Sequence, residues 1–544
     1  MTDELAYLTI SEASALIAAK KLSPLEWTRA CIARIEALEP QLHAFITLTA
    51  DLALESACAA EQEIMRDGVR GPLHGVPFGL KDMFDTHGIR TTAHSKVFQD
   101  RVPSADATVT RRLLDAGGIL LGKLSTHEFA HGGPSFDLPW PPARNPWDTR
   151  RFTGGSSSGS AAAVAAGLLP AALGTDTGGS IRSPSWLSGC VGLKPTFGRV
   201  SRAGVISFSE SCDHVGPLTR SVEDAAILLN LLAGHDAADR GSSQRVLGDV
   251  RASLGDDIKG LRIGFVRHFS ERDLVVNDEL RTAVNAALEV LRQLGAAVED
   301  VTLRPLHDYY AIRVVITESE QFSLHLANLR TRAADYGAHF LGRCLPACLF
   351  GAHHYLSAQR ERRKVIAEMQ PVYQRYDALI TVGAGPAPLL DDHKRMGAAD
   401  WWLKPGMGAL GSVTGAPALA LPCGYSAGGL PLGFQIVGRP WDEATLLRIG
   451  HAYQTATPWR DRHPVLAAGA VAPVIVDIAH EAPAKLDEQY RALAEGCARR
   501  AGLKLTDAQQ VILLEQAPSA LALAARLPLH QPGDEMAGVF SLDH

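Results

Sequence analysis

Paired cysteines, long basic runs and long apolar runs are all missing from this 544-residue sequence. The eight cysteines are scattered without a Cys-x-x-Cys pair, so we expect reduced thiols rather than disulfides. With 53 Lys and Arg against 59 Asp and Glu, no surface suited to nucleic acid is indicated. The longest apolar stretch, 161–174, contains Pro170 and is too short to cross a membrane. The acidic start, 1–4, is not a secretory signal, which predicts a cytoplasmic protein.

From about residue 105 the sequence alternates short apolar runs with helical stretches, which predicts an α/β fold around a mixed or mostly parallel sheet. The apolar runs predict strands at 76–80, 118–122, 171–174, 261–266, 378–382, 418–421 and 432–437. Helical periodicity is found at 107–116, 161–169, 277–294 and over most of 318–376.

The two ends of the chain are predicted to be helical. Capping boxes at Thr9–Glu12 and Ser23–Glu26 start two helices, and Pro40 is expected to end the second. Residues 467–476 are expected to form a linker or a docked extension. We place a main domain at 1–465 and a small helical unit at 480–544, with Thr506 and Ser519 as predicted N-caps.

Three segments carry residues suited to catalysis. The first, Gly154–Ser160, is equally typical of a flexible linker, but it runs into an alanine-rich helix whose N-terminus can bind an anion. The second, Gly174–Arg182, has adjacent glycines before Ser180, which suits an oxyanion hole or a simple tight turn. The third ends at Lys81. A lysine is usually a surface charge, but burial behind a strand would lower its pKa and make it a base.

Three other motifs indicate different chemistry. Gly406–Gly411 matches Gly-x-Gly-x-x-Gly, but no apolar strand precedes it, and we predict a loop. Gly155–Gly159 matches the Gly-x-Ser-x-Gly elbow of α/β-hydrolases, but the segment before it is polar and no strand is expected there. His127–His131 matches the zinc motif His-Glu-x-x-His, but Gly132-Gly133-Pro134 leaves room for barely one helical turn. We therefore predict neither a metal site nor a cofactor.

Taken together, the three segments resemble the amidase signature family. Gly71–Asp82 is similar to its lysine segment, Gly154–Ser160 to its glycine/serine segment and Gly174–Arg182 to its nucleophile segment. The resemblance covers about residues 5–465 and includes the stretches 192–196, 214–217 and 433–440. It implies a mixed sheet covered by helices on both sides.

The resemblance also implies a role for each residue of the site. Ser180 corresponds to the nucleophile, Ser156 to a serine that follows a cis peptide bond, and Lys81 to the base. The backbone N–H groups of Thr177, Gly178, Gly179 and Ser180 correspond to the oxyanion hole. Ser158 and Thr177 depart from the family pattern, where a glycine and an aliphatic residue are usual. We expect these departures to alter the shape of the pocket rather than the mechanism.

The activity that this resemblance implies is hydrolysis of a carbon–nitrogen bond in a small amide-type substrate. Carbamates, ureides and esters stay open as substrates, as does the role of a glutamine-dependent amidotransferase A-type subunit that works with partner subunits. A helical unit that resembles a fused accessory subunit favours a self-contained hydrolase. Ser157, Trp140, Trp401 and Trp402 are candidate substrate contacts, although the tryptophans suit a structural core equally well. A homodimer is one possible assembly.

Overall fold

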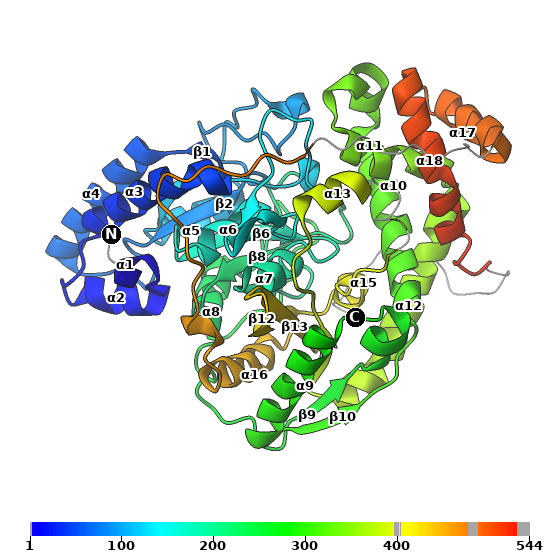
Figure 1. Ribbon diagram of the computed structural model, residues 1–544. Helices are drawn as coiled ribbons and strands as arrows, with labels where there is room; N and C mark the ends of the chain where they lie inside the picture. The colour runs from blue at the N-terminus through cyan, green and yellow to red at the C-terminus, as the bar shows by residue number, and fades with distance from the viewer. Residues whose placement is uncertain (1–2, 397–401, 403, 477–487, 530–544) are drawn as a thin grey trace.

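The computed structural model describes residues 3–396, 402, 404–476 and 488–529. Within these residues, eleven strands form one sheet that crosses the molecule (Figure 1). The strands are β1 (Phe45–Leu48), β2 (Pro77–Lys81), β3 (Ile119–Leu124), β6 (Ala171–Asp176), β7 (Val191–Lys194), β8 (His214–Thr219), β9 (Arg262–Phe265), β10 (Ala297–Asp300), β11 (Ala378–Val382), β12 (Ala418–Tyr425) and β13 (Pro431–Gly438). A second sheet pairs β4 (Arg144–Asn145) with β5 (Asp148–Phe152).

The order of strands in the large sheet is β1-β3-β2-β6-β8-β7-β12-β13-β11-β9-β10. The predicted α/β fold with a mixed sheet is confirmed. The "mostly parallel" version is wrong, because in the described sheet only β2–β3, β2–β6, β9–β10 and β9–β11 pair in parallel. All seven predicted strands are present. The sequence did not reveal β7 and β8, since glycine, proline and charged residues interrupt their apolar pattern.

Helices pack on both faces of the sheet (Figure 1). They are α1 (Asp3–Ala6), α2 (Ile10–Ala18), α3 (Pro24–Leu42), α4 (Ala50–Asp67), α5 (Thr108–Asp115), α6 (Ser158–Ala165), α7 (Arg182–Ser188), α8 (Val222–Leu232), α9 (Asp278–Gln293), α10 (Leu306–Arg332), α11 (Ala338–Cys344), α12 (Ala352–Arg375), α13 (Leu390–Met396), α15 (Ala409–Thr414), α16 (Glu443–Thr455), α17 (Glu488–Arg500) and α18 (Asp507–Ala524). Helix α7 packs on β12 and β13 from one side, and α9 and α16 pack on the same strands from the other.

Both predicted N-caps, Thr9 of α2 and Ser23 of α3, are confirmed, but only α2 has a complete capping box. In α2 the Thr9 side chain accepts the Glu12 N–H, and the Glu12 carboxylate accepts the Thr9 N–H, which forms a complete capping box. The prediction that Pro40 ends α3 is wrong, because the helix continues to Leu42. Proline removes only one N–H donor, and so close to the end the next residues still bond, as His43 N–H does to Glu39 O at 3.0 Å.

The C-terminal helices pack against the right-hand side of the molecule in Figure 1. Helix α18 contacts α10, α11 and the short 3₁₀ helix η5 (Leu345–Leu349), and α17 contacts α18 and η5. Leu513 and Leu514 of α18 are buried. Thr506 caps α18 as predicted. Ser519 does not cap a helix, because α18 runs through it. Residues 467–476 form the docked extension, since Gly469 and Ala472 donate N–H groups to α3.

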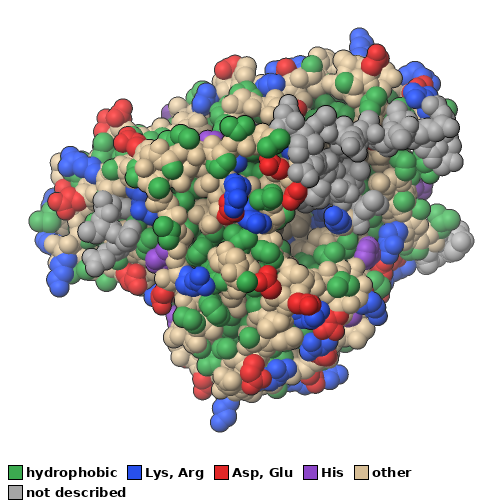
Figure 2. All heavy atoms as spheres, viewed as in Figure 1, with side chains coloured by type: hydrophobic (Ala, Val, Ile, Leu, Met, Phe, Trp, Pro, Cys, Tyr) green, Lys and Arg blue, Asp and Glu red, His purple; other side chains and the backbone are tan. Residues whose placement is uncertain are grey.

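The exposed surface shows no dominant charge. Figure 2 shows basic and acidic side chains interspersed across the face that it draws. None of the helices in the described part of the chain combines the length and apolarity needed to span a membrane.

Candidate active site

Lys81 lies at the end of β2, a fully buried strand between β3 and β6. Its amine is completely buried and donates hydrogen bonds to Ser156 Oγ and Thr175 Oγ1, each at 2.7 Å. Burial lowers the pKa of Lys81 to about 7, although Asp213 and Asp176 act in the opposite direction. A substantial fraction of this amine is therefore neutral near pH 7 and able to accept a proton.

Ser156 belongs to the loop between β5 and α6, and the Gly155–Ser156 peptide bond is cis. The loop is tightly packed: a Cβ atom at Gly155 would lie 2.1 Å from the His127 ring, and one at Gly159 would lie 2.3 Å from Ala44 O. Only glycine fits at these two positions. The close packing holds Ser156 against Lys81.

The elbow motif at Gly155–Gly159 has a strand before it after all, because β5 ends at Phe152. The expectation of no strand was wrong, since pairing with β4 stabilises this polar segment. Ser157, the central serine of that motif, is fully buried, and its Oγ lies 3.3 Å from both Thr175 N and Thr175 O. It does not line the cavity that contains Ser180. The structure thus places Ser157 in the scaffold of the site.

Ser180 lies in the loop that joins β6 to α7, and it is partly exposed. Its carbonyl accepts the Ser157 N–H at 3.2 Å, so the two serine segments are in direct contact. Asp176, the last residue of β6, accepts N–H groups from Gly179 at 2.8 Å and from Ile181 at 3.2 Å. The carboxylate of Asp176 therefore shapes the loop that presents Ser180.

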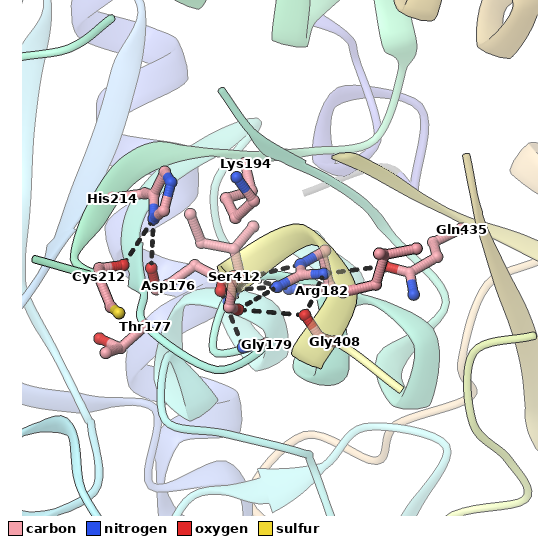
Figure 3. Close-up of polar contacts among 12 residues, drawn as sticks. Asp176, Thr177, Gly179, Arg182, Lys194, Cys212, His214, Gly408, Ser412 and Gln435 are labelled. Carbon is pink, nitrogen blue, oxygen red and sulfur yellow. Dashed lines mark hydrogen bonds and ion pairs between the residues drawn. The ribbon is translucent and has the colours of Figure 1, made fainter. Parts of the chain in front are cut away.

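A buried ion pair between Asp176 and Arg182 holds this loop in place (Figure 3). The Arg182 Nε and Nη2 atoms each lie 2.9 Å from a carboxylate oxygen, and both side chains are inaccessible to solvent. Arg182 also donates to Gly408 O, Ser412 Oγ and Gln435 Oε1 at 3.0 to 3.1 Å. The guanidinium thus ties the Ser180 loop to β13 and to the segment at 408–412. The loop predicted for Gly406–Gly411 is present only at 406–408, because α15 begins at Ala409.

Three of the four N–H groups assigned to an oxyanion hole are unengaged. Within the described residues, those of Thr177, Gly178 and Ser180 have no acceptor. The N–H of Gly179 bonds to Asp176 instead. The Thr177 hydroxyl donates to Asp213 Oδ1 at 2.5 Å, so its side chain is engaged within the protein.

A cavity of about 330 Å³ opens beside Ser180. Trp186, Phe208 and Tyr310 provide apolar surface, and α10 and α11 supply charged groups. Glu318 of α10 lies 2.5 Å from Arg343 and 2.7 Å from His131 Nε2. Burial by itself would raise the pKa of Glu318, but these two neighbours lower it to about 2. Sequence reasoning missed this cluster, because its members lie on separate elements.

The His-Glu-x-x-His motif does not form the helix that a zinc site requires. Its centre is a single 3₁₀ turn, η2 (Glu128–Ala130), and Phe129 there has a left-handed φ of 47°. His127 lies 3.0 Å from Gly132 O through Nδ1 and packs on Gly155, whereas His131 faces Glu318. The two histidine rings therefore contact different groups.

Two of the three tryptophans named as candidate substrate contacts, Trp140 and Trp402, lie away from the cavity beside Ser180. Trp140 packs edge-on against His94, and its carbonyl lies 3.0 Å from His94 Nε2. Trp402 is fully buried, donates to Gly342 O at 3.2 Å and packs under the Arg343 guanidinium. Neither lines the cavity beside Ser180. Trp401 is outside the described residues.

A second, larger cavity of about 770 Å³ borders the site at Thr175. Its lining includes Asp213 and His214 but neither Ser180 nor Ser156. His214 Nδ1 lies within hydrogen-bond distance of the carbonyls of Cys212 and Asp176, as Figure 3 shows. Size alone would favour this cavity, but Ser180 and its loop neighbours Gly178 and Gly179 line the smaller one.

Comparison with known proteins agrees with this geometry. The profile of the Amidase family matches residues 26–447. The A subunit of the glutamyl-tRNA(Gln) amidotransferase of Chloroflexus aggregans is 41% identical over 495 residues, covering 85% of this chain and 99% of the relative. The structure of a peptide amidase from Stenotrophomonas maltophilia is similar with a TM-score of 0.73 and 30% identity, over 84% of this chain and 98% of that one.

A further similar structure comes from a complex described as revealing the origins of an s-triazine catabolic enzyme. Its TM-score is 0.77 with 35% identity, over 82% of this chain and 98% of that chain. A bacterial aryl acylamidase is similar with a TM-score of 0.74 and 26% identity, over 84% of this chain and 97% of that one. The family profile and these relatives cover most of the chain, and the chain therefore belongs to the amidase signature family of amide-cleaving enzymes.

Proposed function

We propose that the protein is a serine amidohydrolase in which Ser180 is the nucleophile, Ser156 relays protons and Lys81 is the base. The observation that carries this proposal is the completely buried Lys81 amine, 2.7 Å from Ser156 Oγ. A serine hydroxyl is a weak nucleophile near pH 7 and needs an adjacent base. A lysine with a pKa near 7 supplies one without histidine.

In the first half of the reaction, Ser180 Oγ attacks the carbonyl carbon of the substrate. The Ser180 proton passes to Ser156 Oγ as the proton of Ser156 passes to the neutral Lys81 amine. Ser156 then protonates the leaving nitrogen and regains a proton from Lys81, and the carbon–nitrogen bond breaks. Water releases the acid from the acyl-enzyme through the same relay.

The negative charge on the tetrahedral intermediate needs donors that are already in position. The N–H groups of Thr177, Gly178 and Ser180 are unengaged in the described structure and belong to one loop. One such donor contributes roughly 3 to 4 kcal/mol to the lowering of a barrier. The Asp176–Arg182 pair supports the proposal, because it fixes the loop before substrate binds.

An amidotransferase A-type subunit is the second candidate. The names of the relatives favour it, since several are A subunits of glutamyl-tRNA(Gln) amidotransferases. Such a protein would hydrolyse glutamine and act with partner subunits. Ammonia release from glutamine by the purified chain, with and without added partner subunits, separates it from a self-contained hydrolase acting on amides, carbamates, ureides or esters in the cytoplasm.

The decisive test replaces Ser180 with alanine. Turnover of every amide substrate should fall by at least about 10³-fold, because the acyl-enzyme can no longer form on the proposed nucleophile. Labelling by a fluorophosphonate should disappear as well. Ser183→Ala, which removes a hydroxyl from the same cavity, is the matched control and should still be labelled. Full activity of Ser180→Ala would overturn the proposal.

A further inference from the structure

Arg313 on α10 is a buried cation for which the described part of the chain supplies no ion-pair or hydrogen-bond partner. Its side chain lines the same cavity as Ser180, and only 8% of the residue is exposed. Among the described residues, no carboxylate lies within ion-pair distance of its guanidinium and no hydrogen-bond acceptor contacts it. Its one specific contact is with the face of the Tyr310 ring, 5.1 Å away. Buried arginines are normally paired, because removing such a charge from water is costly.

The position of this guanidinium relates it directly to the reaction. Arg313 Nη1 lies 2.8 Å from the point that a Cβ atom on Gly178 would occupy. Gly178 contributes one of the unengaged N–H groups of the Ser180 loop. A group bound to Arg313 would therefore lie within the length of a small molecule from the carbonyl that Ser180 attacks.

The charges around the cavity are unbalanced. Three cationic side chains line it: Arg313, Arg343 and Lys404. Among the described lining residues Glu318 is the only carboxylate, and its two oxygens face Arg343 and His131. Burial lowers the pKa of His131, so this imidazole adds little positive charge near pH 7. Among the described residues, the lining therefore has an excess of positive charge that attracts an anion, and it offers no free carboxylate for an ammonium group.

We propose that Arg313 binds a carboxylate of the substrate, so that the enzyme cleaves small amide-type compounds that carry a carboxylate and no ammonium group. This inference rests on the proposed function of Ser180. A planar guanidinium can bind a carboxylate through two parallel hydrogen bonds, which orients the substrate as well as attracting it. Arg313 is thus a substrate-binding residue, and zwitterionic glutamine is a poorer substrate than a monoanionic ω-amide of similar length.

The test compares substrates that differ only in the charged group. Ammonia release is measured from succinamate and glutaramate, from the neutral butyramide and valeramide, and from glutamine. The wild-type protein should prefer the two anions in kcat/KM by about 10- to 100-fold over their neutral partners. Arg313→Gln should remove this preference, because its loss in kcat/KM should be at least about tenfold larger on the anions than on the neutral amides. Arg313→Lys should retain part of it, since it keeps the charge without the planar fork.

Controls separate this inference from the proposal on which it rests. Fluorophosphonate labelling of Ser180 in Arg313→Gln reports an intact catalytic centre, and Arg332→Gln, a more exposed arginine on the same helix, should behave like wild type. Succinate and glutarate should also slow labelling of the wild-type protein, which requires neither turnover nor a variant. Absence of Ser180 labelling would instead contradict the proposed function.

Two outcomes would overturn the inference while the labelling stays intact. One is an equal loss in Arg313→Gln on charged and neutral amides. The other is a wild-type protein that does not prefer the anions and that neither dicarboxylate protects. Preference for glutamine over glutaramate would contradict the exclusion of an ammonium group.

Discussion

The loop that carries Ser180 and helix α10 both contain buried charged side chains, but these are paired differently in the two regions. On the loop side Asp176 and Arg182 neutralise each other, and Lys81 has a pKa near 7. On α10, Glu318 lies within ion-pair distance of Arg343 and His131, but Arg313 has no such partner among the described residues. The Asp176–Arg182 pair fixes the geometry of the Ser180 loop, whereas we propose that the unpaired Arg313 binds the substrate. In this proposal the loop side of the cavity carries out the reaction, and the α10 side selects the substrate.

Cutting the proton relay should have the largest effect among the following changes. Lys81→Ala and Ser156→Ala should each lower kcat by about 10² to 10⁴, because Ser180 loses its base. The double variant should be no worse than either single one, since both interrupt one path. Single-turnover kinetics on a chromogenic amide would measure this, and Ser180 should still be labelled slowly. Additive losses would show that the two residues act independently.

Breaking the Asp176–Arg182 ion pair tests whether this pair fixes the geometry of the Ser180 loop. Arg182→Met leaves the buried Asp176 carboxylate without its cationic partner and should lower the free energy of unfolding by about 3–5 kcal/mol. Urea denaturation would measure the change. The control is Arg150→Met. Arg150 is mostly exposed and its partner Asp148 keeps a second ion pair with Arg151, so the loss should cost less than about 1 kcal/mol. Equal costs for the two variants would contradict the comparison.

The pKa of Lys81 predicts a pH profile. Protonation of the amine removes the base, so kcat/KM should fall about tenfold per pH unit below about 7 and level off above it. A neutral substrate such as butyramide is needed, because its own charge does not change in this range. Lys81→Ala should lack this step in the profile. A wild-type profile that is flat from pH 5 to 9 would exclude Lys81 as the base.

Ser157→Ala should have the smallest effect. Its hydroxyl makes only long contacts, both 3.3 Å, with the Thr175 backbone, and their loss should cost about 1 kcal/mol or less. Activity should stay within roughly threefold of wild type, since Ser157 does not line the cavity. Thermal unfolding and steady-state kinetics would check both values. A complete loss of activity here, with Ser180→Ala still active, would indicate an α/β-hydrolase elbow instead.

Local sequence determined much of the fold and the segments that carry the site. The glycines at 155 and 159 and the strand ending at Lys81 could be recognised because each depends on neighbours along the chain. The same locality explains the confirmed cap at Thr9 and the seven predicted strands. Ser519 and Pro40 were misinterpreted because tertiary packing and neighbouring hydrogen bonds extended helices past a local stop signal.

Tertiary structure decided which charges meet. Nothing in the sequence around Arg313 distinguishes it from an exposed arginine, and its importance comes from α10 crossing beside Gly178. Likewise Glu318, Arg343 and His131 form a cluster although they lie on three elements. Hydrogen bonds and apolar periodicity act over a few residues, so the sequence reveals them directly. The electrostatic environment of a buried group depends on segments brought together by folding, and only the folded chain sets it.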